Sequence, residues 1–241
     1  MSRAAPLISV TQRPGRRLGQ PPPTKGRLRT VCEHGRHGDR LENSRQECRV
    51  RKRKRCMKNP FLIGDRVYLR PLEREDAPLF VTWLNDYDVT RTLLFRGPIN
   101  RQVEESFLDS AYTDEHRFVL GIMTKVTDSL IGATGLEQID FRNRHAKFGI
   151  FIGAKEEWGK GYGTEATRLV TQHAFLTLNL NRVWLHVVAD NERGIRAYER
   201  VGFKREGILR QEHFRDGRYL DTVTMAILRE EWEAMRLPAP N

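Results

Sequence analysis

Three glycines at alternate positions stand directly before a predicted helix, in the stretch WGKGYGTEA that begins at Trp158. The first N–H groups of a helix have no partner within it, and the helix dipole adds partial positive charge, so a helix start binds anions such as phosphate. Glycine allows such a ligand to approach the backbone closely. The stretch lacks the G-x-x-x-x-G-K-[ST] pattern of one phosphate-binding motif and the later acidic residue of the dinucleotide-binding motif. Taken alone, it is typical of an anion-binding turn or of a glycine-rich helix cap.

The other reactive side chains do not form a recognisable metal or nucleophile site. Residues 57–241 contain no cysteine, and their His and carboxylate residues lack metal-ligand spacing, so we expect no metal. His173 lies on the predicted apolar face of the helix after the glycines, which favours a packed core residue over a ligand. A second set, Cys32, His34, His37 and Cys48, matches no zinc-finger spacing and lacks the apolar residues that a finger packs around its metal.

Short-range patterns predict the helices and strands that position these residues. The run RVWLHVV at 182–188 is almost entirely apolar, as expected for a central strand buried on both faces. Asp216-Gly217 between two alternating runs predicts a hairpin. The predicted strands are 66–72, 117–124, 130–140, 145–153, 182–188, 203–214 and 218–228, and the predicted helices are 75–86, 100–112, the segment after the glycines and 191–203.

Capping residues support two of these helices. Asp76 is placed to cap the first, with Pro78 in its first turn. Asn191 or Asp190 is placed to cap the last, and Gly202 to end it. The order of elements predicts a mixed α/β sheet with meanders at its ends and a parallel crossover that contains the glycines.

The charge of the chain divides it into two parts. The net charge is +11, but residues 1–56 hold 16 Lys or Arg and 4 acidic residues, whereas residues 57–241 hold 26 basic and 27 acidic residues. The first part has no Phe, Trp or Tyr and cannot bury enough apolar surface, so we expect it to be disordered. The second part is long enough for one packed core. No apolar run reaches the roughly 18 residues of a membrane span, so we expect a soluble, cytoplasmic protein with no membrane partner.

Three interpretations of residues 1–56 remain open. VRKRKRC at 50–56 fits a nuclear address or a nucleic-acid-binding tail. The first 32 residues contain six arginines and no acid, as in a transit peptide, but without an amphipathic apolar face. Alternatively, the sequence from Met57 looks like a natural protein start, which would make residues 1–56 upstream sequence joined by a misassigned start codon. Because residues 57–241 are almost neutral, we do not expect nucleic acid to be the main partner.

Linked motifs in residues 61–232 resemble the GCN5-related N-acetyltransferase (GNAT) family. Gly161 and Gly163 match the last two fixed positions of its acetyl-CoA motif, [QR]-x-x-G-x-[GA], and Trp158 replaces the Gln or Arg. NERGIRAYERVGFKREG is similar to the family's later segment, in which an Asn is followed by a Tyr and then by Gly-Phe. LNLNRV and the segment GILRQEHFRDGRYLDTVTMAIL resemble the branch that acetylates ribosomal-protein N-termini and spermidine.

The resemblance implies a single GNAT-like α/β domain, with a mixed, mostly antiparallel sheet flanked by helices. Its central parallel strand pair would splay apart to hold acetyl-CoA, and the pantetheine arm would pair with backbone near Phe151 and Ile152. Asn191 would hold this arm through its side-chain amide, and the pyrophosphate would bind N–H groups of the glycine loop. The loop residues expected to bind the cofactor are Trp158, Gly159, Lys160, Gly161, Tyr162, Gly163 and Thr164.

Acyl transfer to an amine requires two proton movements. An alkyl ammonium, with a pKa near ~10.4, must lose a proton to attack, and the departing thiolate, with a pKa near ~8.5, must be protonated or tolerated. Tyr198 occupies the position of the family's phenol donor. As the base, the resemblance favours Glu137 on strand 130–140, with His213 and Asp140 as weaker candidates. Relatives of this branch often read A-E-F where this chain has Ala146-Lys147-Phe148, which argues against the same cationic acceptor.

Three functions follow from these observations. The first is a cytoplasmic N-acetyltransferase that uses acetyl-CoA and an amine acceptor, which is a polyamine, a peptide N-terminus or a small amine. The second is a non-catalytic acyl-CoA-binding regulatory domain, and the third is nucleic-acid binding through residues 1–56. The resemblance also implies a homodimer.

Overall fold

The computed structural model describes residues 57–94 and 97–236. The predictions made for residues 1–56, including the zinc, targeting and disorder interpretations, lie outside the described residues.

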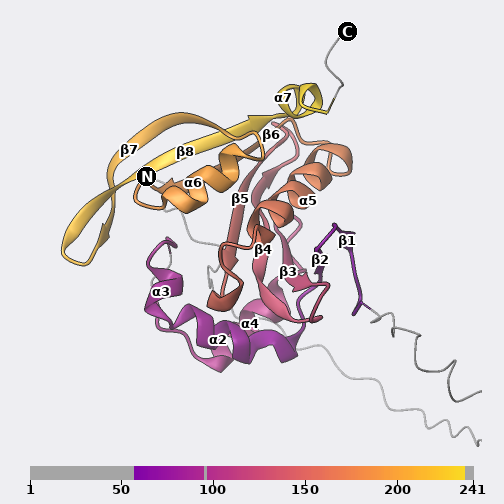
Figure 1. Cartoon of the computed structure of the whole chain (residues 1–241), viewed down its shortest axis with the longest axis vertical. Coiled ribbons are helices and arrows are strands. Elements are labelled where there is room, and N and C mark those ends of the chain that lie inside the picture. The colour runs from indigo at the N-terminus through magenta and orange to yellow at the C-terminus, as the bar shows by residue number, and fades with distance from the viewer. Residues whose placement is uncertain (1–56, 95–96, 237–241) are drawn as a thin grey trace, which may run out of the picture. The chain divides into compact units, whose positions relative to one another are not determined.

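Eight strands form one open sheet in the order β1-β2-β3-β4-β5-β6-β8-β7 (Figure 1). All neighbouring strands are antiparallel except β5 and β6, which are parallel. This arrangement confirms the mixed sheet with a parallel central pair. The strands are β1 Leu62–Ile63, β2 Val67–Arg70, β3 Phe118–Thr124, β4 Leu130–Asp140, β5 His145–Ile152, β6 Arg182–Val188, β7 Lys204–Arg215 and β8 Arg218–Leu228.

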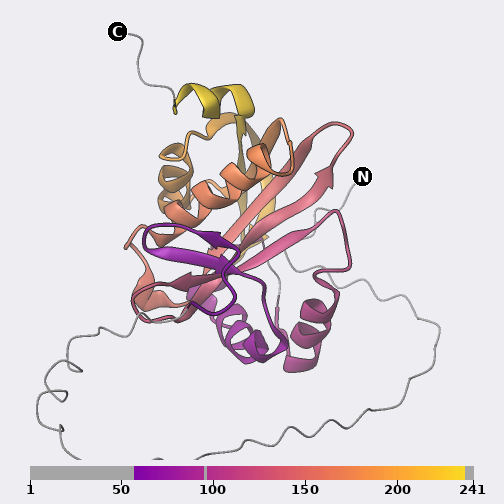
Figure 2. The same ribbon diagram turned by 90° about the vertical axis from the view of Figure 1, so that its right-hand side faces the viewer.

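Helices cover both faces of this sheet, with α5 and α6 on one face and α2 and α4 on the other (Figures 1 and 2). The sequence patterns predicted α2, α4, α5 and α6, with ends that differ by a few residues, but missed α3 and α7, which are too short to show a helical period. The helices are η1 Arg74–Asp76, α2 Ala77–Leu84, α3 Tyr87–Thr90, α4 Arg101–Ser110, η2 Lys155–Glu157, α5 Tyr162–Leu176, α6 Glu192–Glu199 and α7 Arg229–Ala234, where η marks a 3₁₀ helix.

Strand β5 separates the two halves of the core, because successive side chains of a strand point to opposite faces. The Phe151 ring packs edge-on against Phe80 and Trp83 of α2, with centroids 5.7 and 6.4 Å away. Ile150 and Ile152 point the other way, toward the first turn of α5. Each face of β5 therefore contacts a different helix layer.

The sheet opens between its two parallel strands. β5 and β6 pair over only three positions, from His145 opposite Arg182 to Lys147 opposite Trp184. Beyond these positions β5 remains paired with β4, and β6 remains paired with β8. The two strands diverge because each keeps its other neighbour, which confirms the predicted splay.

The two predicted helix caps differ in outcome. Asn191 precedes α6, and its Oδ1 accepts a hydrogen bond from the Gly194 N–H at 3.0 Å, so this cap is confirmed. Asp76 precedes α2 but makes no side-chain capping bond to this helix. Its oxygens instead accept from the buried Arg70 guanidinium at 2.8 Å and from the Glu73 N–H at 2.8 Å, so Asp76 takes part in the capping box of η1 rather than in a cap of α2.

Candidate active site

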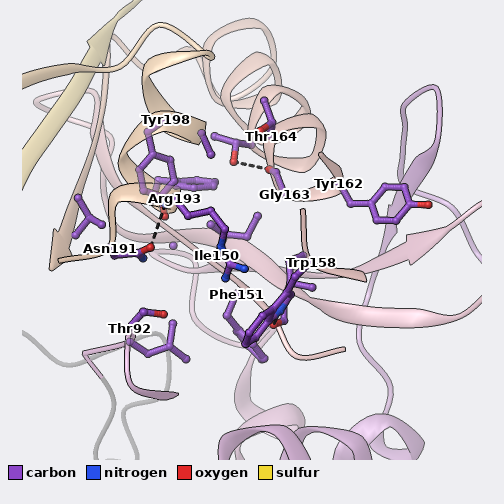
Figure 3. Close-up of a pocket in the computed structure, with 18 of the residues that line it drawn as sticks. Thr92, Ile150, Phe151, Trp158, Tyr162, Gly163, Thr164, Asn191, Arg193 and Tyr198 are labelled. Atoms are coloured by element: carbon purple, nitrogen blue, oxygen red, sulfur yellow. Dashed lines mark hydrogen bonds between the residues drawn. The ribbon is translucent and has the colours of Figure 1, made fainter. Parts of the chain in front are cut away.

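A cavity of about 270 Å³ occupies the opening between β5 and β6 (Figure 3). Its walls come from the second half of β5, the glycine loop and first turns of α5, and α6, and from the segment that follows α2. All but one of the residues predicted for the site line it, namely Glu137, Phe151, Ile152, Trp158, Gly159, Gly161, Tyr162, Gly163, Thr164, Asn191 and Tyr198. The exception is Lys160, whose ammonium pairs with Glu157 at 2.9 Å.

The glycine loop adopts a backbone that only glycine takes readily. Gly159 and Gly161 have φ values of +77° and +83°, and Gly161 is the N-cap residue of α5. Gly163 is different, because a Cβ placed there would come no closer than 3.9 Å to any other residue. Packing within the protein therefore does not require glycine at position 163, and the space beside it remains part of the cavity.

The first N–H groups of α5 point into this space. The backbone N–H groups of Tyr162, Gly163 and Thr164 precede the first intrahelical bond, in which Glu165 donates to the Gly161 carbonyl. No side chain caps this end of α5. These donors, together with the positive end of the dipole of a 15-residue helix, form a site for an anionic group.

Contacts from the start of β2 and from Arg66, the residue before it, fix the loop in place. Arg66 donates from Nη1 to the Lys160 carbonyl at 2.8 Å, and its backbone N–H donates to Glu165 at 2.8 Å. Burial alone would raise the pKa of Glu165, but hydrogen bonds from Arg66 and Val67 hold it below its usual value. The Glu165 charge beside the anion site is therefore neutralised within the protein.

Trp158 has a structural contact that the sequence did not indicate. Its Nε1 donates to the Ile152 carbonyl at 2.8 Å, which ties the loop to the end of β5. This bond occupies one of the backbone groups expected to pair with a pantetheine arm. The guanidinium carbon of Arg193 lies 4.5 Å from the centroid of the Trp158 ring, so α6 adds a positive charge to the same rim (Figure 3).

Tyr198 lies on the α6 side of the cavity in an aromatic environment. Its ring packs against Phe148 and Phe203, with centroids 6.2 and 6.0 Å away. Burial raises the pKa of Tyr198 to about 12, so the phenol keeps its proton at neutral pH. The hydroxyl can therefore donate a proton or a hydrogen bond into the cavity.

The Asn191 side chain both caps α6 and lines the cavity. Its Oδ1 makes the cap through Gly194. Position 194 has to be small, because a Cβ there would lie 2.7 Å from Asn191 Nδ2. The cap leaves the Asn191 amide nitrogen as a donor for a ligand.

Glu137 lies in the cavity wall, but its carboxylate is paired. It is the direct cross-strand partner of Lys147, and its Oε1 lies 3.1 Å from Lys147 Nζ. The two side chains are only 10% and 6% exposed. A carboxylate held by a buried ammonium is less suited to remove a proton than the free carboxylate expected from the sequence.

His186 is a cavity residue that the sequence analysis missed. It lies on β6, two positions after Trp184, and its ring is 5.1 Å from the Trp184 ring. Burial lowers the pKa of His186, and the nearby Lys147 lowers it further, against a smaller opposing effect of Glu212. The imidazole is therefore neutral at pH 7 and can accept a proton. The available signal was a single polar residue inside the apolar run RVWLHVV.

The weaker base candidates lie elsewhere. Asp140 and His213 do not line the cavity, and Asp140 accepts two hydrogen bonds from Asn143 in the β4–β5 turn. His173 stacks on Phe118 with centroids 4.8 Å apart. This contact confirms that His173 is a packed residue.

The cavity passes from one face of the sheet to the other. Phe148 contacts Tyr198 on the α6 face, whereas Lys147, the residue before it, points to the face that α2 covers. Glu137 and His186 share this second face with Lys147. Leu84, Val89, Thr92, Leu93 and Leu94 wall the cavity there.

The tip of the β7–β8 hairpin holds this second wall. Arg215 donates to the carbonyls of Thr90 and Leu93, the latter at 2.9 Å. Tyr87 of α3 also donates to Asp216. Residues more than 120 positions apart thus determine the shape of one end of the cavity.

Within the part of the chain that the structure describes, no group of three or more His, Cys, Asp or Glu side chains could hold a metal ion. No helix in the same residues is both long and apolar enough to cross a membrane.

Comparison with known proteins places this site in context. A family model described as an acetyltransferase (GNAT) domain matches residues 66–204. The spermidine N(1)-acetyltransferase of Vibrio cholerae is 33% identical over 173 residues, which cover 70% of this chain and 97% of that protein. A putative ribosomal N-acetyltransferase of Bacillus subtilis, YdaF, is 40% identical over 105 residues, or 44% of this chain and 57% of that protein.

Solved structures show the same fold. The crystal structure of spermidine N-acetyltransferase from Vibrio cholerae in complex with CoA and spermine superposes with a TM-score of 0.65 at 29% identity. The match covers 70% of this chain and 99% of that chain.

Proposed function

The chain belongs to the GNAT acetyltransferase family and is an acetyl-CoA-dependent N-acetyltransferase, and we propose the following roles for its residues. A primary amine attacks acetyl-CoA directly while both are bound at the cavity between β5 and β6. The observation that carries this proposal is the cavity itself. It joins an anion site at the start of α5, a protonated phenol on one face of the sheet and a neutral imidazole on the other.

The glycine loop would hold the diphosphate of acetyl-CoA. The N–H groups of Tyr162, Gly163 and Thr164 face the cavity without a partner in the described residues, and phosphate is the anion that a helix start binds well. Arg193 adds a cation at the rim, and Asn191 retains an amide donor toward the open edge of β5. These groups fit an elongated ligand that carries negative charge at one end.

Tyr198 would supply a proton to the departing sulfur. Acetyl-CoA contributes a thioester, whose carbon forms the new C–N bond as its C–S bond breaks. With a pKa of about 12, the phenol is protonated throughout the neutral range. Because a thiolate with an ordinary pKa near ~8.5 is a weaker base than the Tyr198 phenolate, the hydroxyl first stabilises the thiolate by donating a hydrogen bond. Tyr198 passes its proton to the sulfur as it regains the proton that the nitrogen loses when the amide forms.

His186 would take the proton from the acceptor ammonium, directly or through one water. It replaces Glu137 as our first candidate, because the Glu137 carboxylate is paired with Lys147, whereas the His186 imidazole is neutral and faces the cavity. Glu137 would then hold the ammonium group of Lys147 in position rather than remove a proton.

The acceptor would enter from the face covered by α2 and α3. Relatives described as spermidine and ribosomal N-acetyltransferases make polyamines and peptide α-amines two acceptor classes to test, beside small amines. A homodimer and a cytoplasmic location remain predictions.

The test uses the full chain with acetyl-CoA and a mixture of spermidine, Ala- and Ser-starting peptides and small amines, analysed by mass spectrometry. We expect one acceptor class to gain an acetyl group. Tyr198→Phe should lower kcat by about 10²-fold, with the KM for acetyl-CoA nearly unchanged, because only the proton donor is lost.

Tyr219→Phe is the matched control, since Tyr219 is 64% exposed on β8 and does not line the cavity. If acetyl-CoA binds but no amine is acetylated under any condition, the domain is a binding module and the proposed reaction is wrong. Equal rates for Tyr198→Phe and Tyr219→Phe would remove Tyr198 from the mechanism.

A further inference from the structure

Every carboxylate that lines the cavity is paired with a lysine. Among the described residues, the acidic side chains in the cavity wall are Glu137 and Glu157. Glu137 lies 3.1 Å from Lys147, and Glu157 lies 2.9 Å from Lys160. A ligand in this cavity therefore finds no carboxylate free to accept an ammonium group.

The remaining charges in the wall are positive. Arg193 and Arg200 line the cavity, and neither has a carboxylate within ion-pair distance in the described residues. Among the described residues, the titratable side chains that line the acceptor face are the Glu137–Lys147 pair, with a sum of zero charge, and the neutral His186, while Glu212, which acts on His186, lies outside the lining. The surrounding wall is apolar, with Leu84, Val89, Leu93 and Leu94.

A polyamine needs a cavity with unpaired carboxylates, whereas among the described residues this cavity has paired carboxylates, arginines without a carboxylate partner and an apolar wall. Once one amine nitrogen is deprotonated for attack, its other amines remain ammonium groups, because their pKa lies near ~10.4. Moving such a group into an apolar cavity without a carboxylate partner is costly, and nearby cations add repulsion. A monoamine with an uncharged body avoids both costs.

Resting on the function proposed above, we propose that the Glu137–Lys147 ion pair determines acceptor specificity. By occupying Glu137, Lys147 excludes acceptors that carry a second cationic group. The substrate class of this enzyme is then a primary amine on an uncharged, largely apolar body. The relatives named for spermidine would differ from this chain at the acceptor end of the site, not at the acetyl-CoA end.

The experiment compares kcat/KM for spermidine with kcat/KM for 2-phenylethylamine as the uncharged-body probe. The wild-type chain should favour 2-phenylethylamine by about tenfold or more. Lys147→Met keeps the length of the side chain but frees Glu137, so the value for spermidine should rise about tenfold relative to that for the monoamine. Lys204→Met is the control, since Lys204 forms an exposed ion pair with Glu231 outside the cavity and should leave the ratio unchanged.

If Lys147→Met fails to fold, because a lone buried carboxylate is destabilising, the preference of the wild-type chain still tests the inferred substrate class. If Lys147→Met folds, a second variant shows whether its gain for spermidine depends on Glu137. The double variant Glu137→Gln/Lys147→Met has no buried charge and should retain the wild-type preference without any gain for spermidine. A wild-type enzyme that favours spermidine overturns the specificity inference but supports acetyl transfer. A folded Lys147→Met variant with an unchanged ratio also overturns it. If neither amine, nor any other amine, is acetylated, the proposed function fails instead.

Discussion

The proton-transfer residues lie on opposite faces of the sheet, and their environments separate their protonation states. Tyr198 packs against the rings of Phe148 and Phe203, and burial raises its pKa to about 12. His186 is half-buried and lies near Lys147, and both effects lower its pKa. At neutral pH, one group therefore holds a proton while the other can accept one, as acyl transfer to an amine requires.

The His186 assignment predicts a specific pH dependence. Because its pKa is lowered, the imidazole is in its base form at neutral pH and becomes protonated only as the pH falls below its ordinary value of 6.5. His186→Gln should lower kcat by about 10²-fold and remove the acidic limb of the pH profile of kcat. Steady-state rates between pH 5 and 9 at saturating substrates measure both effects.

His116→Gln is the matched control, since His116 is exposed and lies outside the cavity lining. An unchanged acidic limb in His186→Gln would assign the base to another group.

Two helices lead to testable predictions about ligand binding and stability, and the first is α5, at its N-terminal turn. Gly163 is in the first turn of this helix, where a Cβ would touch no protein atom closer than 3.9 Å. Gly163→Ala should keep or slightly raise stability, by up to about 1 kcal/mol, because alanine is the better helix former. It should raise the Kd for acetyl-CoA about tenfold or more, because the methyl group occupies the space of the diphosphate.

Calorimetric titration with acetyl-CoA and thermal unfolding measure these two quantities. Gly207→Ala provides the comparison, since a Cβ at this exposed β7 position meets nothing within 4 Å. Unchanged binding in Gly163→Ala would place the diphosphate elsewhere.

The second helix is α4, which carries the fully buried carboxylate of Glu104. Among the described residues, neither oxygen of Glu104 has a hydrogen-bond partner, and burial raises its pKa from 4.5 to about 7. Folding therefore favours the protonated form, so its contribution to stability is fully present below pH 4.5 and is lost as the pH rises to about 7. Glu104→Gln should raise the free energy of unfolding by about 3 kcal/mol more at pH 8 than at pH 4.5.

Urea unfolding at both pH values tests this prediction. Glu75→Gln serves as the control, since Glu75 is an exposed carboxylate in η1. A gain for Glu104→Gln that does not depend on pH would show that Glu104 has the same pKa in the folded and the unfolded protein.

For the whole molecule, the family and the fold expected from the sequence are confirmed by the matching domain model and by a solved structure that superposes with a TM-score of 0.65. Because the family motifs lie in residues 61–232 and the charge contrast sets residues 1–56 apart, we expect that the first segment takes no part in catalysis. Residues 57–241 alone should have the same kcat/KM as the full chain. Any nucleic-acid affinity of the full chain should weaken steeply with salt and be absent from residues 57–241.

Both chains can be compared in one acetylation assay and one DNA titration at several salt concentrations. A loss of activity in residues 57–241, with folding retained, would show that the first segment contributes to the site.

The sequence by itself determined the features that depend on short-range chemistry. The alternating glycines before α5, the Asn191 cap and the order of strands and helices follow from local backbone and pattern rules, and the structure agrees with them. The family motif needed only these local signals. Element ends and the shortest helices were less accurate, because a four-residue helix such as α3 has no period of its own.

Only the tertiary structure decided how the acceptor end is built. Glu137 and Lys147 meet because β4 and β5 pair in one particular register, and a change of one residue would turn either side chain to the other face. His186 reaches the cavity because β6 diverges from β5, and the wall opposite is held by a hairpin more than 120 residues away. Pairing, burial and pKa depend on these long-range contacts, so no local pattern in the sequence could indicate which carboxylate would be neutralised or which imidazole would be free.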